Sequence, residues 1–296
     1  MAHYDTTDAE RRFFTEFEQS IQRKILTEDS TRRAFQKLIY AYYHEHGREL
    51  PWRETDDPYH ILVSEIMLQQ TQVERVIGKY DAFITAFSDF HVLAQAPLQE
   101  ILRVWQGLGY NRRAIALKKI AELVVTTYNG TLPSQQDELQ TFPGIGRYTA
   151  AAIATFAFNQ PTVFIETNIR TVFIHFFFHD RGEIKDTEIL PLVEQTLDTA
   201  HPRQWYYALM DYGAMLKQQH PNPNWRSAHY HKQSAFRGSN RELRGMILRT
   251  LTLESTMSER ELVQTLKMES ERVKKALVQL QDEGFIEKSG NRYRIA

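Results

Sequence analysis

The chain has 296 residues, of which 42% are hydrophobic and 12% aromatic, a composition typical of a globular protein with a full core. Its formal net charge of −1 excludes a uniformly basic surface, so any contact with nucleic acid must be local. The chain contains no cysteine, which excludes disulfides, cysteine-ligated zinc, cysteine-ligated iron–sulfur clusters and cysteine nucleophiles.

The N-terminal part predicts helices and no targeting segment. Residues 1–12 are polar, and no apolar run in the chain approaches the length of a membrane span, so we expect a cytoplasmic protein without membrane contact. Residues 1–48 have apolar side chains at spacings of three and four, which predicts two amphipathic helices. We assign residues 1–32 to an N-terminal helical extension.

Residues 50–73 predict a buried helix that contains a carboxylate. Pro58 follows two aspartates and marks a helix start, and the residues after it are apolar nearly all round the helix. Glu65 interrupts this run. An ionised carboxylate is costly to bury, so we predict an acid of raised pKa there; a glutamate at the edge of a core helix, with its head in water, is the alternative. Three polar residues follow, as at the lip of a pocket: Gln69, Gln70 and Thr71.

Residues 134–158 predict a helix–hairpin–helix. Ser134 with Asp137 is typical of a helix start, and the turn at 142–146 is too short for anything but a sharp reversal. Gly144 and Gly146 allow close approach of a partner, and the free N–H groups of the second helix, which starts at Arg147, favour an anion such as a DNA phosphate. An ordinary helical corner that needs glycine for its turn is the alternative.

A second carboxylate, Glu166, begins another helix together with Thr167 and Asn168. Acidic groups at helix starts are favoured for stability alone. The backbone N–H groups and the dipole at a helix start also stabilise negative charge, which predicts a lowered pKa for the Glu166 carboxyl group. Glu166 would then stay ionised while Glu65 stays protonated. Two carboxylates with such different pKa values are what acid-assisted glycosidic bond cleavage requires.

The C-terminal part combines a basic loop with a small domain. Residues 217–236 are partly irregular. The segment 217–249 is rich in basic residues and contains a single acidic one, Glu242, which favours contact with nucleic acid over a solvated connector. His220, His229 and His231 lie in this loop, but without acidic partners we predict no metal site. Residues 240–296 predict three helices, at about 241–253, 259–267 and 270–281, and a β-hairpin, as in a winged helix. Arg272, Lys274 and Lys275 of its third helix face DNA in this interpretation. Because acidic residues nearly balance the basic ones, an accessory packing or protein-contact role is the alternative.

Over about residues 33–216 the chain resembles the helix–hairpin–helix (HhH-GPD) DNA glycosylases, and among them the MutY-type adenine branch. The matching motifs are LPWR at 50–53, SEIMLQQTQV at 64–73, GLGY at 107–110, PGIGRYTAAAI at 143–153 and LMDYGAM at 209–215. The resemblance implies an all-α fold of two helical lobes with the substrate cleft between them. We therefore predict a glycosylase domain at 33–236 followed by the winged-helix-like domain at 240–296.

The resemblance also implies roles for single residues. Glu65 matches the acid that protonates adenine at N7, Gln70 the residue wedged into the duplex, and Leu108 and Tyr110 the contacts to the opposite, oxidised guanine. Tyr148 stands where lyase-type relatives have a Schiff-base lysine, which implies a monofunctional enzyme. Tyr148 and Asn168 match positions beside the carboxylates or the base, and Arg53 and Asp211 match the base pocket. We assign to DNA binding Gln69, Gln70, Thr71, Leu108, Tyr110, Gly144, Gly146 and Arg147.

Three features depart from the family pattern. The second carboxylate of the family is an aspartate, and here it is Glu166. The four cluster cysteines fall at Lys217, Asn224, Ser227 and Gln233, so we expect no iron–sulfur cluster and no metal, leaving open only a monovalent cation at the helix–hairpin–helix. The winged-helix-like segment stands in place of a Nudix-like domain.

The sequence thus predicts a monomeric base-excision enzyme that flips and releases a purine from double-stranded DNA, adenine opposite 8-oxoguanine or guanine. Two alternatives stay open. A glycosylase for a different lesion or mispair is consistent with Glu166, and a non-catalytic DNA-binding protein would keep the hairpin and the winged helix for docking.

Overall fold

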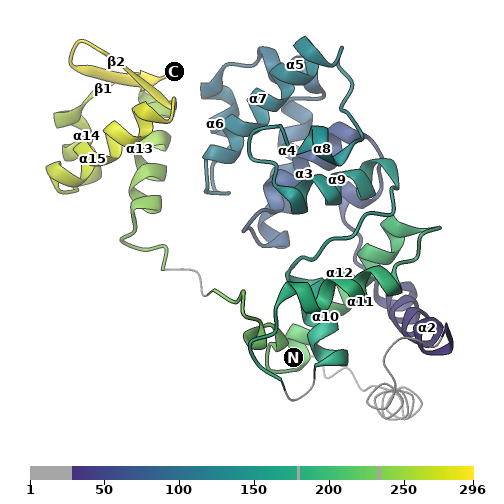
Figure 1. Cartoon of the computed structure of the whole chain (residues 1–296). Coiled ribbons are helices and arrows are strands. Elements are labelled where there is room, and N and C mark those ends of the chain that lie inside the picture. Colours follow the sequence, from purple (N-terminus) through teal and green to yellow (C-terminus); the bar gives the residue numbers. More distant parts are fainter. Residues whose placement is uncertain (1–28, 179–180, 232–234) are drawn as a thin grey trace. The chain divides into compact units, whose positions relative to one another are not determined.

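The computed structural model describes residues 29–178, 181–231 and 235–296 (Figure 1). The predicted helical extension at 1–32 lies outside the described residues except for its last four positions. Helices make up most of the described chain, as predicted. Within the described ranges we find no helix with the length and apolar character needed to cross a bilayer.

The chain divides into two compact units, which we call unit 1 and unit 2. Unit 1 takes in the described residues of Met1–Glu49 and Ala154–Lys232, and unit 2 those of Leu50–Ile153 and Gln233–Ala296. The C-terminal segment therefore belongs to the same unit as the helix that carries Glu65.

Unit 1 is built around aromatic side chains. Its helices are α2 (Asp29–His46), α10 (Thr167–Phe177), α11 (Asp186–Thr196) and α12 (Pro202–Gln219), followed by the short 3₁₀ helix η2 (Pro223–Arg226). The ring of Phe35 on α2 lies 5.8 Å from the ring of Phe173 on α10 and 5.9 Å from that of Trp205 on α12, centre to centre. Such tilted and edge-on pairs add to the stabilisation from burial.

The first part of unit 2 is helical throughout. It contains η1 (Pro51–Arg53), α3 (Pro58–Leu68), α4 (Val73–Ala86), α5 (Phe90–Gln95), α6 (Leu98–Trp105), α7 (Arg112–Thr127), α8 (Gln136–Leu139) and the start of α9 (Arg147–Phe158). The predicted start of α3 is confirmed, because the Asp57 carboxylate accepts the backbone N–H of Tyr59 at 2.8 Å. The predicted cap at Ser134 is wrong: α8 begins one residue later than that cap requires, and Gln135 is its N-cap residue without a side-chain bond.

The C-terminal part of unit 2 has the predicted order of elements. α13 (Asn240–Glu254), α14 (Glu259–Leu266) and α15 (Ser270–Asp282) precede β2 (Ile286–Ser289) and β3 (Arg292–Ile295), and a two-residue strand β1 (Met257–Ser258) was not predicted (Figure 1). The three strands form an antiparallel sheet in the order β1-β3-β2. Ser258 and Glu261 form the predicted capping box of α14. α13 is joined to α6 by the Gln99 side-chain amide, which donates to the Thr252 carbonyl at 3.1 Å.

Candidate functional site

The carboxylate of α3 lies in the interior. Glu65 is 8% exposed, and its neighbours on the helix from Ile61 to Met67 are buried with it. The predicted burial is therefore confirmed, against the alternative of a carboxylate head in water. A carboxyl group in such surroundings favours its protonated form, and the raised pKa of Glu65 stays a prediction.

A buried arginine fixes the C-terminal end of α3. Nη1 of Arg113 donates to the carbonyl oxygens of Ile66 at 3.0 Å and Met67 at 2.8 Å, and Nη2 donates to the Thr71 hydroxyl at 3.0 Å and the Gly109 carbonyl at 3.2 Å. Burial lowers the pKa of this guanidinium to about 10. The last carbonyls of a helix have no partner within the helix, so Arg113 satisfies them and ties α3 to the loop at 107–110.

The residues at the lip differ in what they contact. The Gln69 side-chain amide donates to the Gly144 carbonyl and to the Thr149 hydroxyl, both at 3.2 Å, so the structure brings the lip together with the predicted hairpin. Gln70 is exposed and has a positive φ of 55°, which is unusual for a residue with a side chain. Thr71 is held by Arg113.

The helix–hairpin–helix is confirmed as α8, a turn and α9. The fold requires glycine at one of its two glycine positions and not at the other. Gly144 has φ = 79°, and an added Cβ would lie 3.1 Å from the Cβ of Ala116, so backbone shape and packing both favour glycine. At Gly146 nothing lies within 4 Å of an added Cβ. Gly146 and Arg147 are exposed and Tyr148 is partly exposed at the start of α9. An exposed glycine that is not required by its own fold is what close approach of a partner predicts.

Glu166 is the N-cap residue of α10, in unit 1. Its Oε1 accepts the backbone N–H groups of Asn168 at 2.6 Å and Ile169 at 2.9 Å, and its Oε2 accepts the Asn168 amide at 3.2 Å. The predicted lowering of its pKa is wrong in direction. Burial raises the pKa of the Glu166 carboxyl, and the N–H donors and the nearby charge of Lys217 only oppose this rise. The helix-capping role is confirmed.

A close helix contact positions the start of α10. An added Cβ at Gly213 on α12 would lie 2.2 Å from the Asn168 carbonyl oxygen, so only glycine allows α12 this close to the first turn of α10. The side-chain oxygen of Asn168 is buried without a hydrogen-bond partner among the described residues. An orphaned polar atom beside Glu166 favours a polar ligand or a water molecule there.

The two predicted base-pocket residues lie in different units. Asp211 is 3% exposed, and its carboxylate accepts the backbone N–H of Arg48 at 2.8 Å and the guanidinium Nε at 2.7 Å. This ion pair, inside unit 1, gives Asp211 a structural role that the sequence did not indicate. Arg53 ends η1 in unit 2 and is partly exposed. Their contact with a base stays a prediction.

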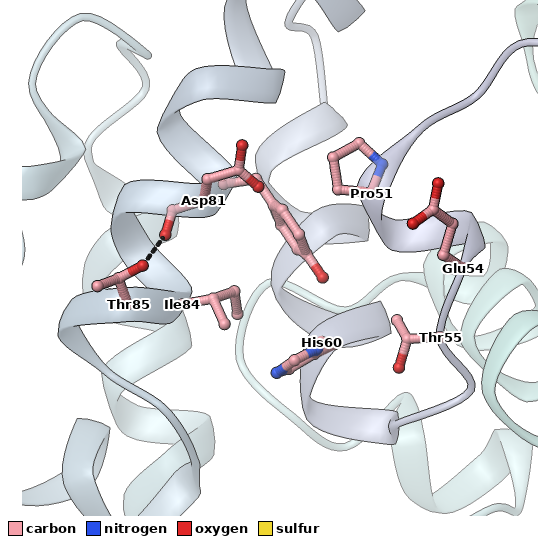
Figure 2. A pocket seen from close by; sticks show the side chains of 8 residues that line it. Pro51, Glu54, Thr55, His60, Asp81, Ile84 and Thr85 are labelled. Carbon is pink, nitrogen blue, oxygen red and sulfur yellow. Dashed lines mark hydrogen bonds between the residues drawn. The ribbon is translucent and has the colours of Figure 1, made fainter.

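Unit 2 contains a small cavity and a larger groove. The cavity, of about 280 Å³, is lined by Pro51, Glu54, Thr55, His60, Tyr80, Asp81, Ile84 and Thr85 (Figure 2), and none of the predicted site residues lines it. The groove, of about 1200 Å³, lies between residues 69–72, the loop and helix start at 106–113, and one face of α13. This groove contains Gln69, Gln70, Thr71, Leu108 and Tyr110. Leu108 is only 2% exposed, so its side chain packs inward.

No metal site is evident in the described ranges 29–178, 181–231 and 235–296, where no group of three or more histidine or acidic side chains is placed to hold an ion. The position of Gln233, matched to a family cysteine, lies outside these ranges. The absence of an iron–sulfur cluster follows from the cysteine-free sequence alone and stays a prediction about the purified protein.

Comparisons with known proteins give a consistent result. Residues 63–193 match the model of the HhH-GPD superfamily of base excision DNA repair proteins. Adenine DNA glycosylase of Mycolicibacterium smegmatis is 34% identical over 74% of this chain and 80% of the relative, and that of Buchnera aphidicola is 37% identical over 62% of this chain and 52% of the relative. The human adenine DNA glycosylase is 34% identical over 62% of this chain and 36% of the relative. The chain thus spans about half or less of several curated relatives that it matches.

Among solved structures, that of a thermostable thymine-DNA glycosylase has a TM-score of 0.55 and 28% identity, and the match covers 62% of this chain and 86% of that one. A trapped endonuclease III–DNA covalent intermediate has a TM-score of 0.50 at 20% identity, over 69% of this chain and 88% of that one. The second likeness concerns the fold alone.

Proposed function

Because this chain belongs to the MutY-type adenine glycosylases of the HhH-GPD superfamily, we propose that it hydrolyses the N-glycosidic bond of adenine in duplex DNA. The proposed substrate is adenine opposite 8-oxoguanine or guanine, extruded from the stack before cleavage. We also propose that the protein acts as a monomer in the cytoplasm. The relatives bear the name of this activity, and the residues below supply its chemistry.

The observation that carries the proposal is the buried carboxyl group of Glu65 on a helix whose lip is bonded to the hairpin. Glu65 is buried midway along α3, and Gln69 at the end of that helix donates to Gly144 of the helix–hairpin–helix. A helix–hairpin–helix suits a phosphate of the DNA backbone. A base extruded beside such a contact would meet a protonated acid close to where the DNA is held.

The proposed reaction uses both carboxyl groups. Glu65 gives its proton to N7 of adenine as the C1′–N9 bond breaks, which leaves positive charge on the sugar. The ionised form of Glu166, favoured by two backbone N–H groups and Lys217, stabilises that charge and takes the proton of the water that adds to C1′. Tyr148 stands at the lyase lysine position, so hydrolysis ends at an abasic site.

The experiment is a set of duplexes with one modified or mismatched base, tested with the Glu65→Gln variant. Glutamine keeps the shape but delivers no proton, and general acid catalysis contributes about 10²–10⁴-fold, so base release should fall by about that factor while duplex binding persists. Glu194→Gln, at an exposed position of α11, is the matched control. Near-normal release by Glu65→Gln would remove the acid role.

A second candidate is a glycosylase for another lesion, and Glu166 in place of the family aspartate favours it. In an unchanged pocket, Glu166→Asp should hold or raise adenine release. In a pocket rebuilt around the longer side chain, the same change should lower release by about 10²-fold, because small misplacements of a catalytic group are costly. The same set of duplexes then identifies the preferred base, and binding without release of any base would favour a non-catalytic protein.

We propose that the reaction needs no metal or cluster. Metal analysis of the purified protein should find no iron or zinc, and strong chelators should change neither the Tm nor base release. A stoichiometric metal would instead assign a function to the histidines at 220, 229 and 231. A monovalent cation at the helix–hairpin–helix would show as a dependence of binding on potassium against lithium at constant ionic strength.

A further inference from the structure

The small cavity of unit 2 plays no part in the proposed function. Its walls are η1 with the segment after it, the first turn of α3, and the second half of α4 (Figure 2). Its volume of about 280 Å³ is close to about 300 Å³, the lower end of the range for sites that hold small molecules. The cavity is therefore large enough for a small ligand or for a single side chain of a partner.

The polar groups of this cavity lack partners within the described ranges. Tyr80 is only 4% exposed, yet its hydroxyl forms no hydrogen bond with any described residue. The His60 ring, centred 6.3 Å from the ring of Tyr80, and the carboxylates of Glu54 and Asp81 also have no hydrogen bond or ion pair there. Of Asp81 only the backbone carbonyl is engaged, by the Thr85 hydroxyl at 2.7 Å (Figure 2). Because buried polar groups normally have partners, a buried tyrosine hydroxyl without one, in a residue that lines a cavity, indicates a polar ligand.

The field at the cavity is negative. Of the side chains that line it, Glu54 and Asp81 are acidic, and within the described part of the chain no lysine or arginine is among them. Asp56 and Asp57 add two carboxylates directly after the turn. Burial, followed by the charges of Asp81 and Asp57, raises the pKa of Tyr80 to about 12, so its hydroxyl is neutral at pH 7 and can accept a hydrogen bond. Such a site repels the phosphates of DNA and attracts a cation.

The chemistry of these groups selects an organic cation. Among the described residues, no three histidine or acidic side chains are grouped so as to hold a metal ion. An ammonium group has three N–H donors and a guanidinium group has five, and their hydrogen bonds to carboxylates are among the stronger ones. We propose that the cavity binds the ammonium or guanidinium group of a small organic cation or of a basic side chain, held between Glu54 and Asp81 with the Tyr80 hydroxyl as a further acceptor.

The position of the cavity gives this binding a structural consequence. Pro51 and Glu54 lie on either side of Trp52 and Arg53 in the chain, and His60 lies on the same helix as Glu65. An occupant in contact with both walls would stabilise the η1 turn against α3. Because a ligand that binds only the folded state raises the Tm, a cation in the cavity should raise the Tm of the protein.

The first experiment tests the class of ligand by isothermal titration calorimetry on the full chain at constant ionic strength. The probe is methylguanidinium, which should bind saturably at one site. Tetramethylammonium carries the same charge without N–H donors. It should bind at least about 10-fold more weakly, since hydrogen bonds to charged groups contribute about 10-fold or more. Equal binding of the two ions, or no saturable binding of methylguanidinium, overturns the proposal.

Four variants test the residues. Glu54→Gln and Asp81→Asn should each weaken methylguanidinium binding by about 3- to 10-fold, because both carboxylates are exposed. Tyr80→Phe keeps the ring and removes a hydroxyl that has no partner in the described fold, so binding should weaken by about 5-fold while the Tm stays unchanged. Glu100→Gln, at an exposed position of α6 outside the cavity, is the matched control. Wild-type affinity in all three cavity variants contradicts the proposal.

Two further probes distinguish the sources of the cation. Putrescine represents a free polyamine, and a blocked Gly-Arg-Gly tripeptide represents a basic side chain of a partner protein. Tighter binding of putrescine than of the tripeptide favours the free polyamine, and the reverse favours the partner protein. Saturable binding of Mg²⁺ that both carboxylate variants abolish would make the cavity a metal site and would overturn the proposal. Base release, measured in the same preparations without any probe, tests the proposed function separately.

Discussion

The two carboxyl groups of the proposed reaction are positioned in opposite ways. Glu65 lies in the middle of an apolar helix, where core packing fixes it and α3 is anchored at its end by a distant arginine. Glu166 lies at a helix start, where the backbone N–H groups of its own helix hold its position, while burial raises the pKa of its carboxyl group. The position of the acid therefore depends on tertiary contacts of unit 2, whereas the second carboxylate is positioned by local helix geometry in unit 1 and only its pKa depends on burial there.

The largest expected effect separates the charge of Glu166 from its capping role. Glu166→Ala should abolish base release, a loss of about 10²–10⁴-fold, and should also destabilise α10 by about 1 kcal/mol through loss of the cap. Glu166→Gln keeps an oxygen for the Asn168 and Ile169 N–H groups but has no charge. We expect it to keep the thermal stability and lose base release in single-turnover assays. Full activity of the glutamine variant would leave only the capping role.

Anchoring of α3 is tested at Arg113. Arg113→Lys cannot reach the carbonyls of Ile66, Met67 and Gly109 together, and each buried acceptor left without a partner costs about 1–3 kcal/mol. We therefore expect the free energy of unfolding to fall by about 3 kcal/mol, measured with urea. Arg103→Lys, at an exposed position of α6, should change stability by less than about 0.5 kcal/mol. Equal stability of the two variants would contradict the anchoring.

The close contact at the start of α10 is tested at Gly213. An alanine Cβ would lie 2.2 Å from a backbone oxygen of Asn168, so the helices must move apart, and overpacking of this kind costs about 1–3 kcal/mol. Because the shift moves the turn that holds Glu166, base release should fall as well. Gly78→Ala is the control in α4, where nothing lies within 4 Å of the added Cβ, and helix propensity should there raise stability by about 0.5–1 kcal/mol.

A smaller effect concerns the attachment of the C-terminal domain to α7. Arg244 and Arg112 lower the pKa of Glu283 to about 2, below the ordinary value of about 4.3. A lowered carboxyl pKa stabilises the fold above the ordinary value, and this stabilisation is lost as pH falls from about 4.3 towards 2. After solvent screening we expect about 1–2 kcal/mol. Denaturation profiles of wild type and Glu283→Gln should therefore converge at low pH, and a constant gap would contradict the linkage.

The sequence predicted the features that depend on local pattern. Burial of Glu65 followed from the apolar run around it, and the hairpin at Gly144 followed from turn chemistry, as did the capping box at Ser258. The sequence could not predict contacts between distant segments. Arg113 is an ordinary helical arginine by spacing, and only the fold places it against the carbonyls of α3. The pKa of Glu166 was predicted with the wrong sign because helix geometry is local, whereas the burial that outweighs it is tertiary.

The smallest effect that we predict tests the surroundings of Glu166 through Lys217, which stands where the family has a cluster cysteine. Burial lowers the pKa of the Lys217 amine, and the charge of Glu166 opposes this shift; in return the positive charge of Lys217 favours the ionised carboxylate. In the proposed reaction, base release requires ionised Glu166, so release should be lost as pH falls through the pKa of that group. Lys217→Met removes the opposing charge and raises this pKa further, which moves the acidic limb of the rate profile to higher pH. Release at pH 8 should change only a few-fold, and Lys119→Met, at an exposed position of α7, should leave the limb in place.

Because an amine of lowered pKa can also act as a nucleophile, borohydride should be added during turnover. We expect no trapped adduct with DNA, and an adduct that disappears in Lys217→Met would turn this lysine from a counter-charge into a lyase residue.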